Sequence, residues 1–121
     1  MLFRSGTITY QATLRNNATA KAIYDILPLE TRYNTWGNEI YFSIPCELEL
    51  EEDCSASVEV GDLAFWPPGK AFCIFYGKTP ASIDDQPRAA SEVSVFGTMD
   101  GDCALLKKAK GGKISVEKIE S

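Results

Sequence analysis

The sequence predicts an all-β fold, mainly antiparallel, in which about eight short strands close into a small barrel with one or two short helices. Short runs of alternating polar and apolar residues recur along the chain, and turn-forming Gly, Pro and Asn residues separate them. One segment shows clear helical spacing instead. The chain has 121 residues, 45% of them hydrophobic, which fits a single domain over residues 1–121.

The first predicted elements are a strand and the helix. Residues 7–14 alternate between polar and apolar side chains, as in a half-buried strand. Residues 16–17 are both Asn and offer an N-cap, and residues 18–27 place apolar side chains on one helical face. Pro28 prevents the helix from continuing. We therefore expect one short helix packed on the sheet.

A β-hairpin is predicted next. Residues 29–36 and 39–44 are expected to be strands, and the Gly37-Asn38 pair between them has glycine first, as a type II′ turn prefers. Because side chains alternate across a strand, the second strand has a polar face and an apolar face. The polar face carries Glu39, Tyr41 and Ser43, and the apolar face carries Ile40, Phe42 and Ile44. The apolar face is expected to join the core.

The central stretch, residues 60–80, contains two aromatic-rich strands around a rigid turn. Residues 63–66 and 71–76 are short apolar runs typical of buried strands, and Pro67-Pro68-Gly69 separates them. The pattern predicts a strand, a turn and a second strand, with the cis or trans state of both prolines left open.

The remaining segments are predicted from composition and alternation. Residues 46–53 carry five carboxylates in eight positions without the spacing of a calcium loop, so a solvated edge strand or loop is expected. Residues 80–91 are polar, contain two prolines and predict a long surface loop. Further expected elements are short strands at residues 57–60 and 92–96, a helical turn at 103–110 and a last strand at 113–119.

The charge of the chain limits its classes of partner. Lys and Arg total 12 against 17 Asp and Glu, for a net charge of -5, so nucleic acid and anionic membranes are not expected partners. No apolar run approaches the roughly 20 residues that span a bilayer. The amino terminus reaches Arg4 and Gly6 too early for a signal peptide. A cytoplasmic protein is expected.

The four cysteines do not predict a metal site. They form no CxxC pair, and the chain contains no histidine to complete a mixed zinc site or to activate a Ser or Cys nucleophile. We expect reduced thiols that act as small apolar residues, with a bridge between Cys46 and Cys54 as the alternative. No metal and no cofactor are expected.

Two stretches carry a resemblance to a known family. They are NTWGNEIYFSIP, residues 34–45, and GDLAFWPPGKAFCIFYGKTP, residues 61–80, followed by SEVSVFG at residues 91–97. The chain resembles the small cyclophilin-like family of bacterial and archaeal proteins whose function is not established. The resemblance implies a closed barrel of about eight strands, related in fold to the peptidyl-prolyl isomerases but shorter. Fold alone does not imply isomerase activity.

The residues of an isomerase site are not matched. Classical cyclophilins bind proline in a groove on the outer face of the barrel, where an arginine polarises the proline carbonyl and a histidine helps to shape the pocket. This chain has no histidine, and none of its four arginines lies in a segment that resembles the cyclophilin motif. No catalytic residue is therefore assigned, and an isomerase lacking the usual histidine is kept as an alternative.

Candidate binding residues lie in the two stretches that carry the resemblance. Trp36 and Tyr41 flank the carboxylate of Glu39, and this set suits a small ligand held by hydrogen bonds beside aromatic rings. The alternative is a solvated outer face with a structural Trp. Trp66 and Phe75 are the candidates in the second stretch, where the alternative is that the aromatics fill the barrel.

Three functions remain open. The first is a protein that binds a small molecule or peptide segment in a cleft, over which the loop could bring Arg88 as a cation. The second is the isomerase, and the third is a homodimeric interaction protein without a ligand. The binding function is the primary hypothesis.

Overall fold

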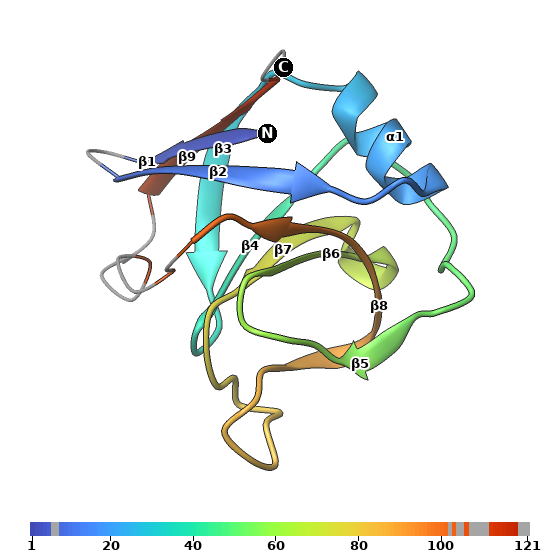
Figure 1. The fold of residues 1–121 in the computed structure, drawn as a ribbon, viewed down its shortest axis with the longest axis vertical. Coiled ribbons are helices and arrows are strands. Elements are labelled where there is room, and N and C mark those ends of the chain that lie inside the picture. Colours follow the sequence, from blue (N-terminus) through green and yellow to red (C-terminus); the bar gives the residue numbers. More distant parts are fainter. Residues whose placement is uncertain (6–7, 102, 104–105, 107–111, 119–121) are drawn as a thin grey trace.

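The strands of the protein form one continuous sheet in a computed structural model that describes residues 1–5, 8–101, 103, 106 and 112–118 (Figure 1). The elements in chain order are β1 Leu2–Ser5, β2 Ile8–Leu14, α1 Ala18–Asp25, β3 Leu29–Thr35, β4 Glu39–Ser43, β5 Ser55–Ser57, β6 Asp62–Trp66, a 3₁₀ turn Pro67–Gly69, β7 Ala71–Phe75, β8 Arg88–Met99 and β9 Gly112–Glu117.

The sheet closes on itself into a barrel. Within the described residues the strand order is β2-β1-β9-β3-β4-β7-β6-β8, and a pairing between β2 and β8 completes a ring of eight strands. Every neighbouring pair is antiparallel. Strand β5 lies outside the ring and pairs with β8. The predicted all-β, mainly antiparallel barrel is confirmed.

The helix forms where helical spacing predicted it. Asn17 is the N-cap, and its side-chain oxygen accepts a hydrogen bond from the backbone N–H of Ala20 at 2.8 Å. The side chain of Ile23 is fully buried in the barrel core. The helix ends at Asp25, before the cis bond between Leu27 and Pro28. No helix of the described residues is long and apolar enough to cross a bilayer.

Strand β1 was not predicted. Its four residues include exposed Arg4, so they show no alternation long enough to predict a strand. Pairing on both sides, with β2 and with β9, makes this short segment part of the ring.

Strand β8 begins earlier than predicted. The segment from Arg88 to Ser91 was expected to belong to the long loop because it is small and polar. It is instead strand, because β8 extends beyond the ring and pairs there with β5. The predicted helical turn at 103–110 lies largely outside the described residues, although Cys103 and Leu106 are described and buried.

The 3₁₀ turn gives the two prolines of the central stretch their conformation. The peptide bonds before Pro67 and Pro68 are trans. Lys70 closes the turn with a φ of 48° and donates its backbone N–H to the carbonyl of Pro67 at 3.0 Å. The chain then reverses directly into β7.

The barrel interior is built around stacked phenylalanines. Phe72 is fully buried, with its ring centroid 4.9 Å from that of Phe42 in a stacked arrangement and 4.9 Å from that of Phe96 edge to face. Phe3 contacts the same ring edge to face at 5.6 Å. These rings come from four strands, so Phe72 joins opposite parts of the barrel.

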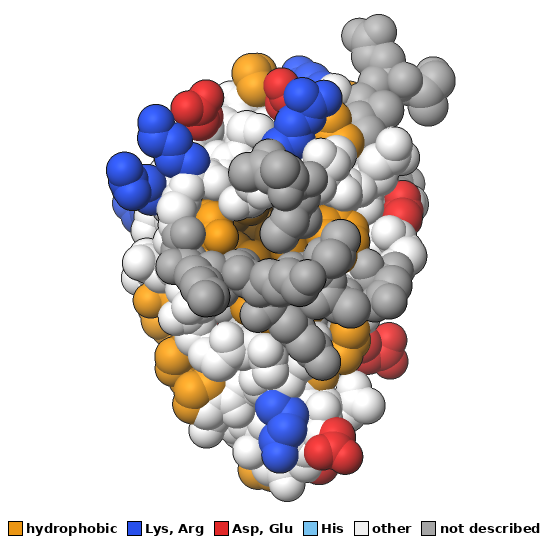
Figure 2. Space-filling view, turned by 90° about the vertical axis from the view of Figure 1, so that its left-hand side faces the viewer, with side chains coloured by type: hydrophobic (Ala, Val, Ile, Leu, Met, Phe, Trp, Pro, Cys, Tyr) orange, Lys and Arg blue, Asp and Glu red, His pale blue; other side chains and the backbone are white. Residues whose placement is uncertain are grey.

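The outer surface carries charges of both signs. On the face shown in Figure 2, the Lys and Arg side chains and the Asp and Glu side chains lie scattered around the margin, with apolar side chains between them. The acidic segment at residues 46–53 contains no regular strand or helix, and most of it is exposed, as predicted for a solvated loop.

We expect Phe72→Ala to lower the free energy of unfolding by about 3–5 kcal/mol, because it removes the ring shared by three aromatic contacts. Ile83→Ala is the matched control, since Ile83 is 85% exposed, and it should change stability by less than about 0.5 kcal/mol. Urea denaturation measures both. Similar losses in the two variants would contradict this account of the core.

Candidate binding site

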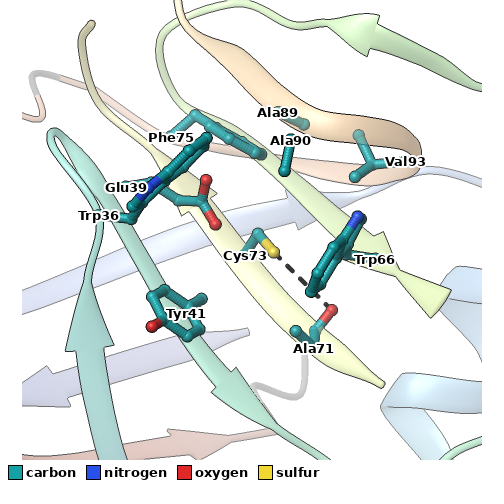
Figure 3. Close-up of a pocket in the computed structure, with 10 residues that line it drawn as sticks. All are labelled: Trp36, Glu39, Tyr41, Trp66, Ala71, Cys73, Phe75, Ala89, Ala90 and Val93. Carbon is teal, nitrogen blue, oxygen red and sulfur yellow. Dashed lines mark hydrogen bonds between the residues drawn. The ribbon is translucent and has the colours of Figure 1, made fainter. Parts of the chain in front are cut away.

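A pocket lies on the outer face of β4, β7 and β6, on the opposite side of these strands from the barrel interior. Its cavity has a volume of about 280 Å³. Alternation along β7 turns Phe72 and Ile74 inward and Ala71, Cys73 and Phe75 outward to the pocket. The lining residues are Trp36, Glu39, Tyr41, Trp66, Ala71, Cys73, Phe75, Ala89, Ala90 and Val93 (Figure 3).

Five of the six predicted site residues meet in this pocket. Glu39 and Tyr41 come from β4, Phe75 from β7, Trp66 from the end of β6, and Trp36 from the hairpin between β3 and β4. The aromatics of the central stretch are divided between two places. Trp66 and Phe75 line the pocket, whereas Phe72 and Tyr76 belong to the barrel core.

Arg88 does not join them. Its side chain donates a hydrogen bond from Nη1 to Oγ of Ser57 at 3.0 Å. It lines a neighbouring hollow together with Ile83 and Asp84. Arg88 is the first residue of β8, and strand pairing with Ser57 of β5 holds its backbone beside that neighbouring hollow.

Glu39 is a buried carboxyl group, with a relative exposure of 6%. Its strand partner is Phe75, and the next pair on the same face of the two strands is Tyr41 with Cys73. In Figure 3 its carboxylate points toward the thiol of Cys73 and into the pocket. The alternative of a solvated outer face therefore does not hold at Glu39, because β8 covers this part of the sheet.

Burial changes the acid–base properties of this pair. Desolvation raises the pKa of Glu39 to about 7, and the neighbouring Cys73 thiol, whose Sγ also donates to the carbonyl of Ala71 at 3.9 Å, opposes the rise by a smaller amount. The pKa of Cys73 is raised well above its ordinary value, first by desolvation and then by the charge of Glu39. The thiol is therefore protonated at neutral pH, while Glu39 is close to half ionised.

Trp36 is positioned by the tip of the β3–β4 hairpin. Its backbone N–H donates to the carbonyl of Glu39 at 2.9 Å, and Gly37 follows with a φ of 61°, as the predicted type II′ turn requires. A Cβ on Gly37 would lie 2.9 Å from Cδ of Pro80. Only glycine therefore fits between the hairpin tip and the loop that supports it.

Trp66 is held on two sides. Its indole Nε1 donates to Oγ of Ser91 at 2.7 Å, which ties the ring to β8. A Cβ on Gly69 would lie 2.9 Å from Cζ3 of the ring, so the indole packs directly on the backbone of the 3₁₀ turn. These two contacts fix the orientation of the Trp66 indole, which forms one wall of the pocket, in the absence of a ligand.

Five residues that line the pocket were not predicted as site residues: Ala71 and Cys73, which form its floor, and Ala89, Ala90 and Val93, which form one wall. Ala71 and Cys73 could have been found, because they alternate with the core residues of β7. Ala89 and Ala90 could not, since their segment was predicted as loop. Val93 was predicted in a strand, but that strand is distant in sequence from the rest of the pocket, and nothing local places it there.

The remaining sulfur and carboxylate groups form no metal centre in the described part of the chain. No three His, Cys, Asp or Glu side chains lie close enough there to hold an ion. The four cysteines are free thiols, so the alternative bridge between Cys46 and Cys54 is not formed.

The raised pKa of Glu39 predicts a pH dependence of stability. The Glu39 carboxyl keeps its proton to a higher pH in the folded state than in the unfolded chain. Its contribution to the free energy of unfolding is therefore complete below about pH 4.5 and is lost as pH rises through about 7. The free energy of unfolding of Glu39→Gln, taken relative to that of the wild type, should therefore rise by on the order of 2 kcal/mol from pH 5 to pH 8. Urea denaturation of both proteins measures this gain. An equal difference at the two pH values would show that Glu39 titrates normally.

Comparison with known proteins agrees with this architecture. No protein with a curated description matches the chain. The solution structure of a hypothetical protein from Archaeoglobus fulgidus is similar, with a TM-score of 0.81 and 38% sequence identity over 98% of this chain and 92% of that one. The family described as Cyclophilin-like matches residues 1–117. The resemblance in the two quoted stretches is therefore confirmed, and the chain belongs to the cyclophilin-like family.

Proposed function

We propose that the protein is a binding protein that holds a small molecule, or one side chain of a peptide, in the pocket on the outer face of β4, β7 and β6. The observation that carries the proposal is the cavity itself. It is concave, has aromatic walls, and contains one buried carboxyl group. Apolar cavities with a few convergent polar groups are the usual form of small-ligand sites.

The size of the cavity favours a small occupant. Its volume of about 280 Å³ lies just below the roughly 300–1,000 Å³ range of ligand pockets. This volume suits a small metabolite or a single side chain better than several residues of a peptide.

The rigidity of the walls also supports binding. The indole of Trp66 is fixed by Ser91 and Gly69, and the backbone of Trp36 is positioned by the glycine turn beside Pro80. A ligand that enters such a site loses less free energy in ordering the protein, because the Trp66 side chain and the hairpin turn are already held in place.

Binding fits the pocket better than isomerisation does. Among the described lining residues there is no arginine or other cation to polarise a proline carbonyl. The large exposed apolar side chains of the described residues are Leu50, Val60 and Ile83, which are separate in sequence and give little support to a homodimer interface.

A plugged pocket tests the proposal. Ala90 is exposed yet lines the cavity, so Ala90→Trp should fill it without disturbing the barrel core. We expect members of a fragment panel of amines, acids, amides and proline peptides to shift the indole N–H resonances of Trp36 and Trp66 in the wild type. The plugged variant should lose these shifts.

Ala18→Trp is the matched control, because Ala18 is an exposed residue of α1 that does not line the pocket. It should behave as the wild type. Ligand shifts that persist in Ala90→Trp, or a panel without effect on either indole, would contradict the proposed function.

A further inference from the structure

We infer that the pocket binds a methylated ammonium group, with the Glu39 carboxylate as its counter-ion and the indoles of Trp36 and Trp66 as its walls. The inference rests on the proposed function, since it names the chemistry of the ligand in that same pocket. It is carried by the position of one buried carboxylate among aromatic rings (Figure 3).

The first argument is that the protein supplies no positive partner for Glu39. In the described part of the chain, the ion pairs between Lys or Arg and acidic side chains all involve other carboxylates. The titratable group that acts on Glu39 is the Cys73 thiol, and the charge of Glu39 in turn acts on the Tyr76 phenol; burial raises the pKa of both groups. Both are therefore neutral at pH 7, and a cation from outside would complete the site.

A second buried carboxylate shows what a structural role looks like in this protein. Asp62 is 7% exposed, and its Oδ2 accepts the backbone N–H of Glu59 at 2.9 Å, which closes the turn before β6. Glu39 accepts no such backbone hydrogen bond among the described residues and meets only a thiol. Its carboxylate faces the cavity instead, so its burial serves no turn or cap.

The aromatic walls suit a cation. In Figure 3 the two indoles lie on opposite sides of the space that contains the Glu39 carboxylate and the Cys73 thiol, with Tyr41 and Phe75 completing the enclosure. The face of an indole attracts cations more strongly than other aromatic faces do, and rings around a quaternary ammonium are an established mode of recognition.

The shortage of acceptors selects a methylated cation over one with several N–H groups. A guanidinium brings five donors and a primary ammonium brings three, and each donor buried without a partner costs about 1–3 kcal/mol. The walls offer the carboxylate of Glu39 and few other acceptors, because the other lining side chains are mostly aromatic or aliphatic and an indole N–H only donates. Methyl groups replace those donors and pack against the rings.

The test compares two probes of equal shape. Choline carries a trimethylammonium group, and 3,3-dimethyl-1-butanol carries an uncharged tert-butyl group in its place. Titrations followed by the indole N–H resonances at pH 8 should give an affinity for choline at least about tenfold higher than for the alcohol, equivalent to about 1.4 kcal/mol. Glu39→Gln, which keeps the volume of the side chain, should remove this preference and leave the weak binding of the alcohol.

The dependence on pH gives a second readout. Because only ionised Glu39 pairs with the cation and its pKa is about 7, choline affinity should fall about tenfold from pH 8 to pH 6. The affinity for the alcohol should not fall with it. A choline affinity that is the same at both pH values would overturn the inference.

The outcomes also separate this inference from the proposed function. If the alcohol binds as tightly as choline, or Glu39→Gln keeps the preference, the ammonium inference is wrong and the pocket still binds ligands. If neither probe binds, the inference is wrong, and the fragment panel with Ala90→Trp then decides whether the proposed function falls too.

Discussion

The burial of β4, β7 and β6 on both faces is the constraint on which the rest of the structure depends. Inward side chains such as Phe72 complete the barrel core, while outward ones such as Cys73 and Phe75 form a second apolar layer. The second layer is covered because β8 extends past the ring and pairs with β5. A strand covered on both sides has little freedom to slip, since a shift by one residue would exchange its two sets of side chains.

The same arrangement explains how a carboxyl group comes to be buried on the outer face of a barrel. An outer face normally meets water, and Glu39 on an uncovered β4 would be solvated. The extension of β8 brings Ala89 and Val93 over this face and removes most of that water. The raised pKa of Glu39 is thus a consequence of the strand that encloses the pocket.

The features that could be predicted from the sequence are those with local causes. Alternation correctly separated the two faces of β4, and Asn17 correctly marked the start of α1. Strand β1 could not be predicted because four residues around an exposed arginine show no period, and its place depends on two partners distant in sequence. The polar composition of residues 88–91 indicated a loop, because nothing local reveals their pairing with β5.

The candidate site shows the same division. Trp36, Glu39 and Tyr41 were found together because one hairpin carries them, and Trp66 and Phe75 because their aromatic strands flank one turn. The enclosure by β8 is a tertiary feature that brings together strands far apart in sequence. Arg88 was assigned to a mobile loop for the same reason, whereas its strand pairing and its hydrogen bond to Ser57 keep it out of the pocket.

The size of the side chains on the two faces gives a reason why the cavity exists. Strands β6 and β7 point Leu63, Phe65, Phe72 and Ile74 into the barrel and point Ala64, Ala71 and Cys73 outward. A layer that only had to cover the sheet would be filled by larger residues, because close packing stabilises a core. Small residues on the floor leave a space between Trp36 and Trp66, and the indole of Trp66 is held by contacts with Ser91 and Gly69 that do not involve that space. Among the described residues, this loosely packed space therefore lies beside a buried carboxyl group that has no ion-pair partner, and the proposed ligand would offset both costs by filling the space and pairing with the charge.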